Sequence, residues 1–385
     1  MLKCIVKLEP GGKQVMKKRI LHIAQAPGGV ERYLHTLLSN IDKERYENIL
    51  VCSQDYDIDS FKSITDSIVV VPMYRNISLP QEIRTVVKLR RIIKKYSPDI
   101  VYLHSSKAGA VGRIADLGIK NYCIYNAHGW AFNMKCGKKK QFIYAAIEKL
   151  LAPFCDKIIA ISEFEKQSAL NHKICSKDKI KVIYNGVTSS CDNSHDSSLA
   201  GIVPDDAYVV GFVGRISKQK APDVFIKSAA IIKKKIKNAF FIIVGDGEDR
   251  EKLESLISNL GLSGSVLITG WIDNPEIYIK RFDIAMLLSR WEGFGLVLPE
   301  YMLAKKPIIA TKADAIPELV HNDVNGYLVD IDDYSSAAKY AIMLHNDKQL
   351  ASRLASAGYD IAMSDFTSER FVKNHEKLFE EIVRL

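Results

Sequence analysis

The chain has no long hydrophobic run: nowhere do its 385 residues approach the roughly 20 uncharged apolar residues that span a bilayer. The basic N-terminus is also too poor in apolar residues to be a secretory signal. The seven cysteines are an odd number and include no Cys-x-x-Cys pair, which argues against a disulfide framework and against a zinc site. We therefore expect a cytoplasmic protein with reduced thiols.

The fingerprint of dinucleotide-binding enzymes is missing as well. The Gly28-Gly29 pair is not part of a G-x-G-x-x-G motif, and Gly245-Asp246-Gly247 lacks the third glycine, so a dinucleotide oxidoreductase is not supported. The chain also has no net negative charge, because lysine and arginine together outnumber aspartate and glutamate by nine. This basic balance suits a partner that carries phosphate, although it also serves solubility alone.

What the sequence does contain is a regular alternation of short β-branched runs and longer amphipathic segments. The expected strands are residues 19–24, 47–53, 67–72, 99–104, 122–128, 157–162, 179–185, 208–214, 239–246, 265–270, 283–289 and 307–311. The expected helices include residues 82–96, 140–154, 222–236, 248–261 and 299–305. This alternation predicts parallel sheets covered by helices on both faces.

A segment rich in serine and aspartate between Val187 and Tyr208 interrupts the alternation and is typical of a linker. We expect an α/β protein with two Rossmann-like, doubly wound domains, residues 16–195 and 196–366, and a C-terminal helix at 367–385 that packs back on the first domain. The first 15 residues are expected to contribute little to the fold. Ligands bind at the carboxyl ends of such sheets, so we expect a site in a cleft where the two domains face each other.

The densest chemical signal is LSRWEGFGLVLPE at residues 288–300. A strand is expected to end near Ser289, and Gly293 and Gly295 then permit a tight turn. Pro299 suits the first position of the following helix. Backbone N–H groups in such a turn, close to a helix N-terminus, favour a diphosphate.

Two acids flank this turn. Glu300 falls in the first helical turn, where a carboxylate repels phosphate and is better suited to a neutral diol such as ribose. Glu292, at the start of the turn, can reach the sugar end of a ligand. The alternative is a plain turn in which Glu300 complements the helix dipole.

Two cations follow the first strand of the second half. Arg215 comes directly after the strand, and Lys220 lies five residues further on. Cations that converge at the carboxyl end of a strand can neutralise a diphosphate leaving group. The alternative is a solvated basic loop.

The first half supplies three further candidates. The Gly28-Gly29 turn after the first strand allows close approach of a donor or acceptor, although a plain turn explains it too. His128 ends a strand, where it can hydrogen-bond a sugar hydroxyl or share a proton, or else serve as a core or capping histidine. Asn185 begins Asn-Gly-Val at the end of the last strand of this half.

Taken together, these motifs resemble the retaining glycosyltransferases of family 4, which have the GT-B fold. The resemblance extends over about residues 16–385 and is most specific at Glu292 and Glu300, two acids separated by seven residues. Its other parts are the tracts KPIIAT, IPELV, GYLV and AISEFEK, the Gly-Gly loop, His128, Asn-Gly-Val, and Arg215 with Lys220.

The resemblance implies a role for each residue. Arg215 and Lys220 hold the donor diphosphate, Glu300 the ribose, and Glu292 the hydroxyls of the transferred sugar. The pocket for sugar and phosphate is lined by Gly293, Phe294 and Gly295, His128 lies near the reacting carbon, and the donor side is completed by Gly28, Gly29 and Asn185. The transfer keeps the anomeric configuration and needs no metal or other cofactor, and the departing phosphate helps to deprotonate the acceptor.

Two motifs depart from the family pattern. Thr188 stands where an aspartate often follows Asn-Gly-Val. Asp314 and Ala315 stand where a Gly-Gly pair often precedes Ile-Pro-Glu. Both departures concern contacts with sugar and phosphate, whereas the two acids and two cations are intact.

Two basic amphipathic segments favour an anionic membrane surface, although ordinary solvated helix faces show the same pattern. One carries the cations Arg84, Lys88, Arg90, Arg91, Lys94 and Lys95. The other has Lys135 and Lys138–Lys140 before the apolar residues Phe142, Ile143, Tyr144 and Ile147. We expect weak peripheral contact with the inner face of the plasma membrane. The acceptor side is expected to include Ser105, Ser106 and Lys107.

These features predict transfer of a sugar from a nucleoside-diphosphate sugar, with UDP preferred, to a saccharide or polyprenyl-linked acceptor in cell-surface polysaccharide synthesis. A glycan phosphorylase of the same architecture would need a lysine-bound cofactor in a larger domain. A nucleotide-sugar epimerase would release nucleotide without any acceptor. A nucleic-acid-binding protein is suggested only by net charge, and no nucleic-acid motif is present.

Overall fold

The computed structural model describes residues 17–25, 27–74, 76, 78–188 and 202–383. The expected N-terminal extension and most of the expected linker lie outside these residues. Contacts divide the chain into two units. The first comprises residues up to Asn126, Pro153–Ile158 and the end from His375, and the second comprises Ala127–Ala152 and Ile159–Asn374. This division differs from the expected domains because segments 127–152 and 159–188 contact the later part of the chain.

Seven strands form the first sheet, in the order β3-β2-β1-β4-β5-β6-β7. They are β1 Lys18–Ala24, β2 Tyr46–Cys52, β3 Ser67–Val70, β4 Ile100–His104, β5 Tyr122–Asn126, β6 Lys157–Ala160 and β7 Ile180–Val182. The pairings of β1 with β2 and β4, of β2 with β3, and of β4 with β5 are parallel. All seven strands were expected from the sequence. Several end earlier than expected, because the last residues of those runs, apolar ones included, belong to the loops that follow the strands.

The helices that follow these strands begin where the sequence places caps and glycines. They are α1 Gly29–Asn40, α2 Ile58–Phe61, α3 Leu79–Tyr96, α4 Ser106–Asp116, α5 Lys138–Leu151 and α6 Glu163–Asn171, with short 3₁₀ turns at Ala131–Asn133 and Ala152–Phe154. In α3 the buried residues Thr85, Leu89 and Ile93 recur every four positions, which gives one face toward the sheet.

A cluster of buried polar side chains lies at the centre of the first unit. The hydroxyl of Tyr33, on α1, is 2.6 Å from the hydroxyl of Tyr102 and 2.6 Å from Nε2 of His375. His375 comes from α14, Ser368–Val383, so the second half of this helix packs in the first unit. The ring of His22 contacts that of Tyr102, and burial lowers the pKa of His22 to about 4. Burial also raises the pKa of Tyr33 and of Tyr102, so His22 and the two tyrosines are uncharged near neutral pH.

The second sheet has six strands, in the order β10-β9-β8-β11-β12-β13. They are β8 Tyr208–Val213, β9 Ala239–Val244, β10 Val266–Ile268, β11 Ile284–Leu287, β12 Ile308–Thr311 and β13 Tyr327–Val329. All five pairings are parallel. The strand β13, within GYLV, was not expected, because three residues carry too little periodicity to distinguish a strand.

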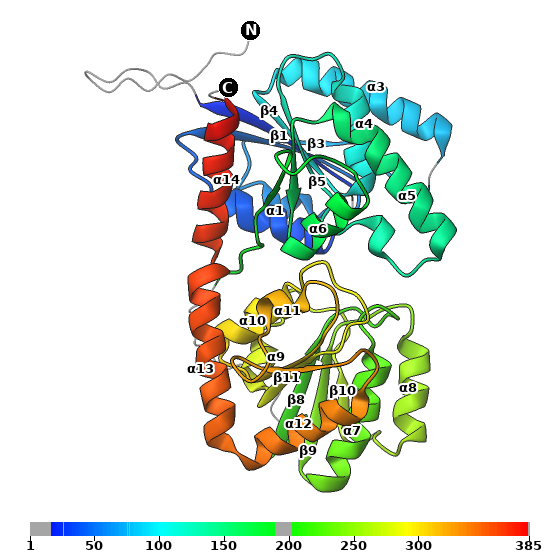
Figure 1. The fold of residues 1–385 in the computed structure, drawn as a ribbon, viewed down its shortest axis with the longest axis vertical. Helices are drawn as coiled ribbons and strands as arrows, with labels where there is room; N and C mark the ends of the chain where they lie inside the picture. Colours follow the sequence, from blue (N-terminus) through cyan, green and yellow to red (C-terminus); the bar gives the residue numbers. More distant parts are fainter. Residues whose placement is uncertain (1–16, 26, 75, 77, 189–201, 384–385) are drawn as a thin grey trace, which may run out of the picture. The chain divides into compact units, whose positions relative to one another are not determined.

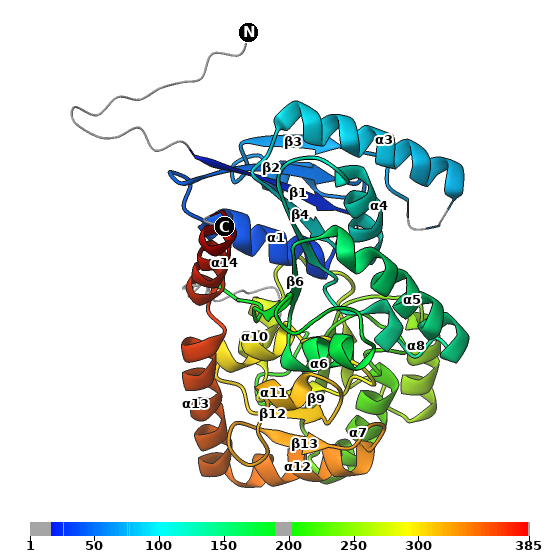
Figure 2. The ribbon, with the colours of Figure 1, turned by 45° about the horizontal axis from the view of Figure 1, so that its top comes forward.

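Helices cover both faces of this sheet (Figure 1). They are α7 Pro222–Lys235, α8 Arg250–Asn259, α9 Glu276–Arg281, α10 Val297–Leu303, α11 Ile316–Leu319, α12 Tyr334–Asn346 and α13 Lys348–Asp365. Side chains of β9 alternate between the faces: Phe241 and Ile243 join the core with α7 and α12, and Ile242 joins the core with α10. Figure 2 shows α12 beside α7, with which it packs.

In each sheet the first strand lies in the interior. The next two strands along the chain are added on one side of it and the later strands on the other, so the strand order reverses beside the first strand. The reversal lies between β1 and β4 in the first unit and between β8 and β11 in the second. Loops at the carboxyl ends of such neighbouring strands are where open α/β sheets bind ligands. The loop after β8 holds Arg215 and Lys220, and the loop after β11 holds Glu292.

Two expectations from composition concern the membrane and the cysteines. In the part of the chain that the structure describes, no helix combines the length and apolar character required to cross a bilayer. The five described cysteines, Cys52, Cys123, Cys136, Cys155 and Cys175, are all free thiols. Cys4 and Cys191 lie outside the described residues.

Candidate functional site

An ion pair joins the two loops at the reversal point of the second sheet. Nζ of Lys220 lies 2.5 Å from Oε2 of Glu292, and the two side chains are only 20% and 10% exposed. Lys220 follows β8 and Glu292 follows β11, which are neighbouring strands. The structure thus brings together a cation predicted to bind diphosphate and an acid predicted to bind sugar hydroxyls.

Glu292 is fixed by two further hydrogen bonds. The hydroxyl of Ser289 donates to the same carboxylate oxygen at 3.2 Å, and the backbone N–H of Glu292 donates to Oδ2 of Asp314 at 2.9 Å. Ser289 is itself held, because Thr311 on β12 donates its hydroxyl to the Ser289 carbonyl at 2.6 Å. The carboxylate therefore has a defined position before any ligand binds.

Asp314 explains one departure from the family pattern. Its φ is 47°, in the left-handed region that glycine adopts without strain and that aspartate tolerates better than most residues. Its side chain also supplies the acceptor for the N–H of Glu292. Burial raises the pKa of Asp314, and the nearby carboxylate of Glu292 adds to this, while the hydrogen bond from Glu292 opposes it. Asp314 thus adopts a backbone conformation that suits glycine and adds a hydrogen bond that glycine could not make.

The glycine-rich turn after Glu292 packs closely against its surroundings. Gly295 has φ 84°, and a Cβ there would lie 3.2 Å from side-chain atoms of Leu287 and Leu298. The carbonyl of Gly293 accepts a hydrogen bond from the hydroxyl of Ser162 at 2.9 Å. Glycine is therefore favoured at 295 by conformation and by space, whereas at 293 a Cβ would make only ordinary contacts and the backbone carbonyl provides the link to Ser162.

The ring of Phe294 does not line a pocket. It is 2% exposed, and its centroid is 6.0 Å from that of Tyr184 and 5.8 Å from that of Phe366. The family resemblance implied that Phe294 helps to line the pocket for sugar and phosphate. Only the backbone of this residue is left for that role, because its side chain belongs to the hydrophobic core.

The helix that carries Glu300 starts earlier than expected. Because α10 begins at Val297, Pro299 is its third residue and not its first. Glu300 is half-buried in the first turn, as predicted. The helix is tied to β8, since the backbone N–H of Val213 donates to the buried hydroxyl of Tyr301 at 2.8 Å. Sequence reasoning missed Tyr301, which looks like an ordinary apolar core residue.

Arg215 differs from Lys220 in its surroundings. Its side chain is exposed, and it makes no ion pair or hydrogen bond with another described residue. Both cations follow β8, but only Lys220 is held by an acid of the protein itself. Arg215 is thus accessible to an anion.

His128 lies in a turn that abuts the glycine-rich loop. Its φ is 55°, and a Cβ built on Gly293 would lie 3.4 Å from Cα of Gly129. The turn is anchored by Glu165 on α6, whose carboxylate accepts from the backbone N–H of Trp130 at 2.9 Å. Burial raises the pKa of Glu165 to about 7. Glu165 lies within the AISEFEK tract, but no feature of the sequence predicted its contact with Trp130.

Asn185 is the remaining candidate for the donor side in the second unit. It is 5% exposed, and among the described residues its Oδ1 has no hydrogen-bond partner. The following Gly186 is needed for packing, because a Cβ there would lie 2.7 Å from the Thr367 carbonyl oxygen. The Asn-Gly-Val motif is thus explained in part by its contact with Thr367, between α13 and α14.

The candidates of the first unit fall at its own reversal point. Gly28 has φ 89°, and a Cβ on Gly28 or Gly29 would meet nothing within 4 Å, so this loop borders open space. Ser105 follows β4 with φ 77°, and Ser106 begins α4. Lys107 is anchored elsewhere: its ammonium is 2.8 Å from Oε1 of Glu82 and also bonds backbone carbonyls of the loop before α3.

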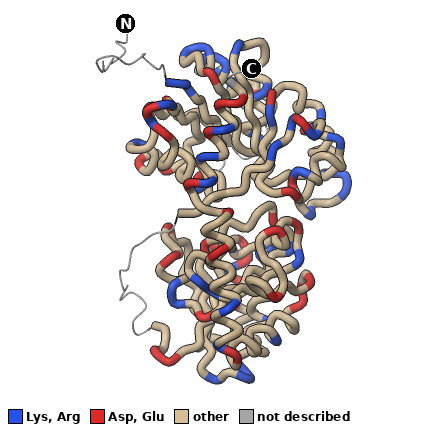
Figure 3. Tube along the Cα trace, turned by 60° about the vertical axis from the view of Figure 1, so that its left-hand side comes forward, with Lys and Arg blue, Asp and Glu red and all other residues tan. Residues whose placement is uncertain are grey.

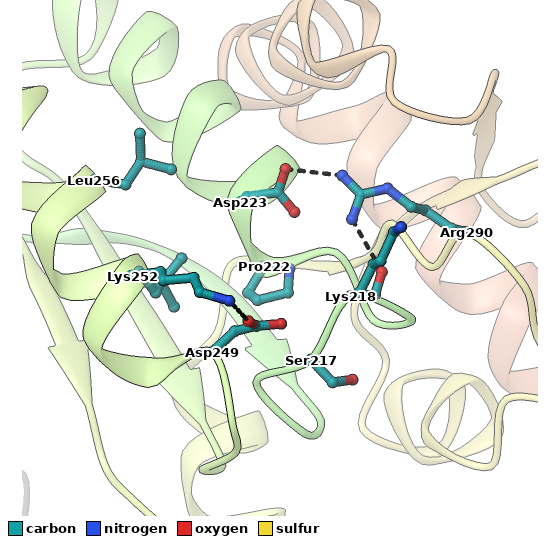
Figure 4. Close-up of a pocket in the computed structure, with 9 residues that line it drawn as sticks. Ser217, Lys218, Pro222, Asp223, Asp249, Lys252, Leu256 and Arg290 are labelled. Carbon is teal, nitrogen blue, oxygen red and sulfur yellow. Dashed lines mark hydrogen bonds and ion pairs between the residues drawn. The ribbon is translucent and has the colours of Figure 1, made fainter. Parts of the chain in front are cut away.

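A cavity of about 250 Å³ lies beside the loop that carries Lys220 (Figure 4). It opens between α7 and α8 and is lined by Ser217, Lys218, Pro222, Asp223, Asp249, Lys252, Leu253, Leu256 and Arg290. Neither Lys220 nor Glu292 lines it. Within the described ranges, no three His, Cys, Asp or Glu side chains gather as metal ligands.

Two family models together match most of the chain. The model for Glycosyltransferase Family 4 matches residues 27–190, and the model for Glycosyl transferases group 1 matches residues 200–361. The chain belongs to glycosyltransferase family 4. The resemblance inferred from the two acids, the two cations and the glycine loops is thereby confirmed.

Curated relatives match this family 4 glycosyltransferase over nearly its full length. It is 28% identical to the UDP-Gal:alpha-D-GlcNAc-diphosphoundecaprenol alpha-1,3-galactosyltransferase of Escherichia coli, covering 87% of this chain and 89% of the relative. It is 25% identical to the capsular polysaccharide biosynthesis glycosyltransferase CapM of Staphylococcus aureus, covering 95% and 98%.

Solved structures establish the fold. HepE of Anabaena, crystallised with UDP and glucose, matches with a TM-score of 0.83 and 24% identity over 94% of this chain and 100% of HepE. Sucrose-phosphate synthase of Thermosynechococcus elongatus matches with a TM-score of 0.82 and 18% identity over 95% and 99%. The glycosyltransferase has the GT-B fold, as predicted from the sequence. The expected cleft between its two domains stays a prediction.

Replacing Asp314 tests its double role in the turn that holds Glu292. We expect Asp314→Ala to lower the free energy of unfolding by about 1–2 kcal/mol, because alanine is strained at positive φ and offers no acceptor for a buried N–H. Asp314→Gly removes only the acceptor and is expected to cost less. Asp314→Asn keeps both properties and is expected to stay within about 0.5 kcal/mol of the unchanged protein. Denaturant unfolding measures all three, and an alanine variant as stable as the asparagine variant would contradict this role.

Proposed function

We propose that this glycosyltransferase moves a hexosyl group from a UDP-sugar to a hydroxyl of a saccharide, carried on a polyprenyl diphosphate, with retention of configuration and without a metal ion. The observation that carries the proposal is the pairing of Lys220 with Glu292 at the reversal point of the second sheet. A donor presents an anionic diphosphate next to a hydroxylated sugar, and this pair presents a cation next to an acid.

The donor diphosphate is assigned to Arg215 and Lys220. When the donor binds, its phosphate oxygens replace the carboxylate of Glu292 as the partner of Lys220, and Arg215 adds a second cation. Both charges then stabilise the negative charge that grows on the leaving diphosphate in the transition state. The UDP and glucose bound to HepE support the choice of a UDP-sugar.

The two acids bind hydroxyl groups. Released from Lys220, the carboxylate of Glu292 accepts hydrogen bonds from hydroxyls of the transferred sugar, while its backbone stays fixed by Asp314. Glu300 accepts from the ribose. The carboxylates thus orient neutral parts of the donor, and the cations hold its charged part.

Retention follows from departure and attack on the same face of the sugar. The C1–O bond to the diphosphate breaks as the acceptor oxygen approaches C1 from that face, and the acceptor proton passes to the departing phosphate oxygen. His128, held in the turn beside Gly293, is assigned to a sugar hydroxyl near the reacting carbon. Asn185, Gly28 and Gly29 are assigned to the remaining donor contacts.

The acceptor class is supported by the relatives. The name of the Escherichia coli relative gives a lipid-linked acceptor, and that of the Staphylococcus aureus relative gives capsular polysaccharide biosynthesis. We assign Ser105 and Ser106 to the acceptor side, with Lys107 holding the adjacent loop. The alternatives of a phosphorylase, an epimerase or a nucleic-acid-binding protein gain no support from these relatives.

A lipid-linked acceptor requires contact with a membrane, and α5 has the surface for it. Its large apolar side chains Phe142 and Leu150 are 75% and 71% exposed, and Ile143 and Ile147 are 53% and 43% exposed. At 100° per residue these four side chains span an arc of about 140°. Lys138–Lys140 begin the same helix and are exposed, which adds about 1 kcal/mol of attraction per cation to an anionic surface.

The helix α3 has a similar stripe in the first unit. Leu79, Ile83 and Val87 recur every four residues and are 75%, 63% and 43% exposed. Exposed cations accompany them: Arg84, Lys88, Arg91, Lys94 and Lys95. Arg90, which the sequence grouped with these, instead donates to the carbonyls of Ala115 and Leu117. Lysines and arginines occur in both units (Figure 3), so net charge alone does not single out these helices. We propose weak peripheral attachment to the inner face of the plasma membrane from the cytoplasm.

The Glu292→Gln variant tests the donor site. We expect turnover with a UDP-sugar and a lipid-linked acceptor to fall by at least about 100-fold, because glutamine cannot supply the same charged acceptor in the transition state. Affinity for UDP, measured by calorimetry, is expected to stay within about threefold, because the cations remain. Glu251→Gln, an exposed acid on α8, is the matched control and should leave both values unchanged.

The same assay tests the rest of the proposal. The product should keep the anomeric configuration of the donor, and EDTA should leave turnover unchanged. Nucleotide release should require the acceptor, and UDP should bind more tightly than GDP or ADP. Full turnover by Glu292→Gln would contradict the role of the acid, and release without acceptor would favour the epimerase.

Vesicle sedimentation tests the membrane surface. We expect the protein to bind phosphatidylglycerol vesicles at low salt and to dissociate at high salt, because charge attraction is screened. Lys138→Glu with Lys139→Glu should abolish binding, and Phe142→Ser with Leu150→Ser should weaken it at either salt concentration. Lys234→Glu with Lys235→Glu, on α7, is the matched control for charge. Failure of the unchanged protein to bind at low salt would refute the attachment.

A further inference from the structure

Arg290, two residues before Glu292, bridges three parts of the second unit. Its guanidinium donates to Oδ2 of Asp223 at 2.8 Å and to Oδ1 of Asp332 at 2.7 Å. A third N–H group donates to the backbone carbonyl of Lys218 at 2.9 Å. The side chain is 16% exposed, and Figure 4 shows it directed toward Asp223 and the Lys218 carbonyl. One side chain thus contacts the first turn of α7, the loop before α12 and the loop after β8.

The backbones of the two site loops are joined at the same place. The N–H of Arg290 donates to the Gln219 carbonyl at 2.8 Å, and the side-chain amide of Gln219 donates to the Trp291 carbonyl at 3.1 Å. With the bond from Arg290 to Lys218, three hydrogen bonds connect residues 218–219 to residues 290–291. Lys220 and Glu292 are the next residues along each loop, and their ion pair ends this row of contacts.

We propose that Arg290 is a positioning residue that locks the loop after β8 onto the loop after β11, and thereby holds the ammonium of Lys220 where the donor diphosphate binds. This inference rests on the proposed function, because it assigns Lys220 to the diphosphate. Arg290 itself lines the cavity between α7 and α8, which does not include Lys220 or Glu292. Its guanidinium is already bonded to Asp223, Asp332 and the Lys218 carbonyl, so its proposed action passes through the backbone of residues 218–219 and not through contact with the donor.

The chemistry of the site requires an arginine at this position. A planar guanidinium presents several N–H groups in a fixed fork and can serve two carboxylates and a carbonyl together, whereas an ammonium is a single point of charge. Burial alone would lower the pKa of Arg290 and raise that of Asp223, but their mutual ion pair outweighs it, so Arg290 shifts upward and Asp223 downward. Both groups stay charged. The ion pair between Arg290 and Asp223 is thus present at neutral pH.

The test compares ligands that differ only in the diphosphate. We expect Arg290→Gln to weaken binding of UDP and of inorganic pyrophosphate about tenfold, as measured by calorimetry, because Lys220 is no longer held in place. Binding of uridine, which lacks the diphosphate, should not change. In turnover, KM for the donor should rise while KM for the acceptor stays constant. Arg290→Lys should recover only part of the UDP affinity.

A double variant separates positioning from a general loss of stability. In a Lys220→Ala background, Arg290→Gln should change UDP affinity by less than about twofold, because two residues that act through one contact are not additive. Arg353→Gln is the matched control, since Arg353 donates to the carbonyl and the carboxylate of Asp323 elsewhere in the same unit. It should leave UDP, pyrophosphate and uridine binding unchanged.

Three results would overturn the inference. Equal UDP affinity in the unchanged protein and Arg290→Gln would show that the lock does not serve the donor. Additive losses in the double variant would show that Arg290 does not act through Lys220, and an equal loss of uridine binding would indicate general damage to the unit. If the unchanged protein binds neither UDP nor pyrophosphate, the proposed function fails as well, which distinguishes the two failures.

Discussion

The pairing of Lys220 with Glu292 is the contact on which the candidate site depends. An ammonium and a carboxylate that are largely buried together are stable only when geometry and further hydrogen bonds compensate for their lost hydration. The structure provides such support through Ser289, Asp314 and the cross-link between the two loops. Each charge compensates the other in the free protein. Under the proposed function, a nucleoside-diphosphate sugar offers each a new partner, phosphate for the lysine and hydroxyls for the acid.

The fold brings these two residues together because β8 and β11 are neighbours in the sheet although more than 70 residues separate them in sequence. Their carboxyl ends meet at the reversal of strand order, where no crossover helix covers the loops. Around this point the packing is tight. A side chain at Gly295 would be strained and would crowd Leu287 and Leu298, Tyr301 ties α10 to the end of β8, and α13 packs behind α10. The site is therefore held by elements that belong to the core.

Much of this could be predicted from the sequence. The strands follow from β-branched runs, and the acids, the cations and the glycines stand at the strand ends, where parallel sheets bind ligands. The sequence could not show that the ring of Phe294 enters the core, because an aromatic residue in a loop is equally suited to either side. Arg290 looked like one more basic residue, since its partners Asp223 and Asp332 are brought to it only by folding. The division into units also differed, because hydrogen bonds such as that from Ser162 to Gly293 link residues far apart in the chain.

A crystal structure with bound UDP tests the central claim most directly. The account predicts that Nζ of Lys220 and the guanidinium of Arg215 lie within hydrogen-bonding distance of the diphosphate oxygens, that Glu300 contacts the ribose, and that the Lys220–Glu292 contact is broken. UDP bound with its diphosphate distant from both cations, or with the Lys220–Glu292 pair intact, would contradict it.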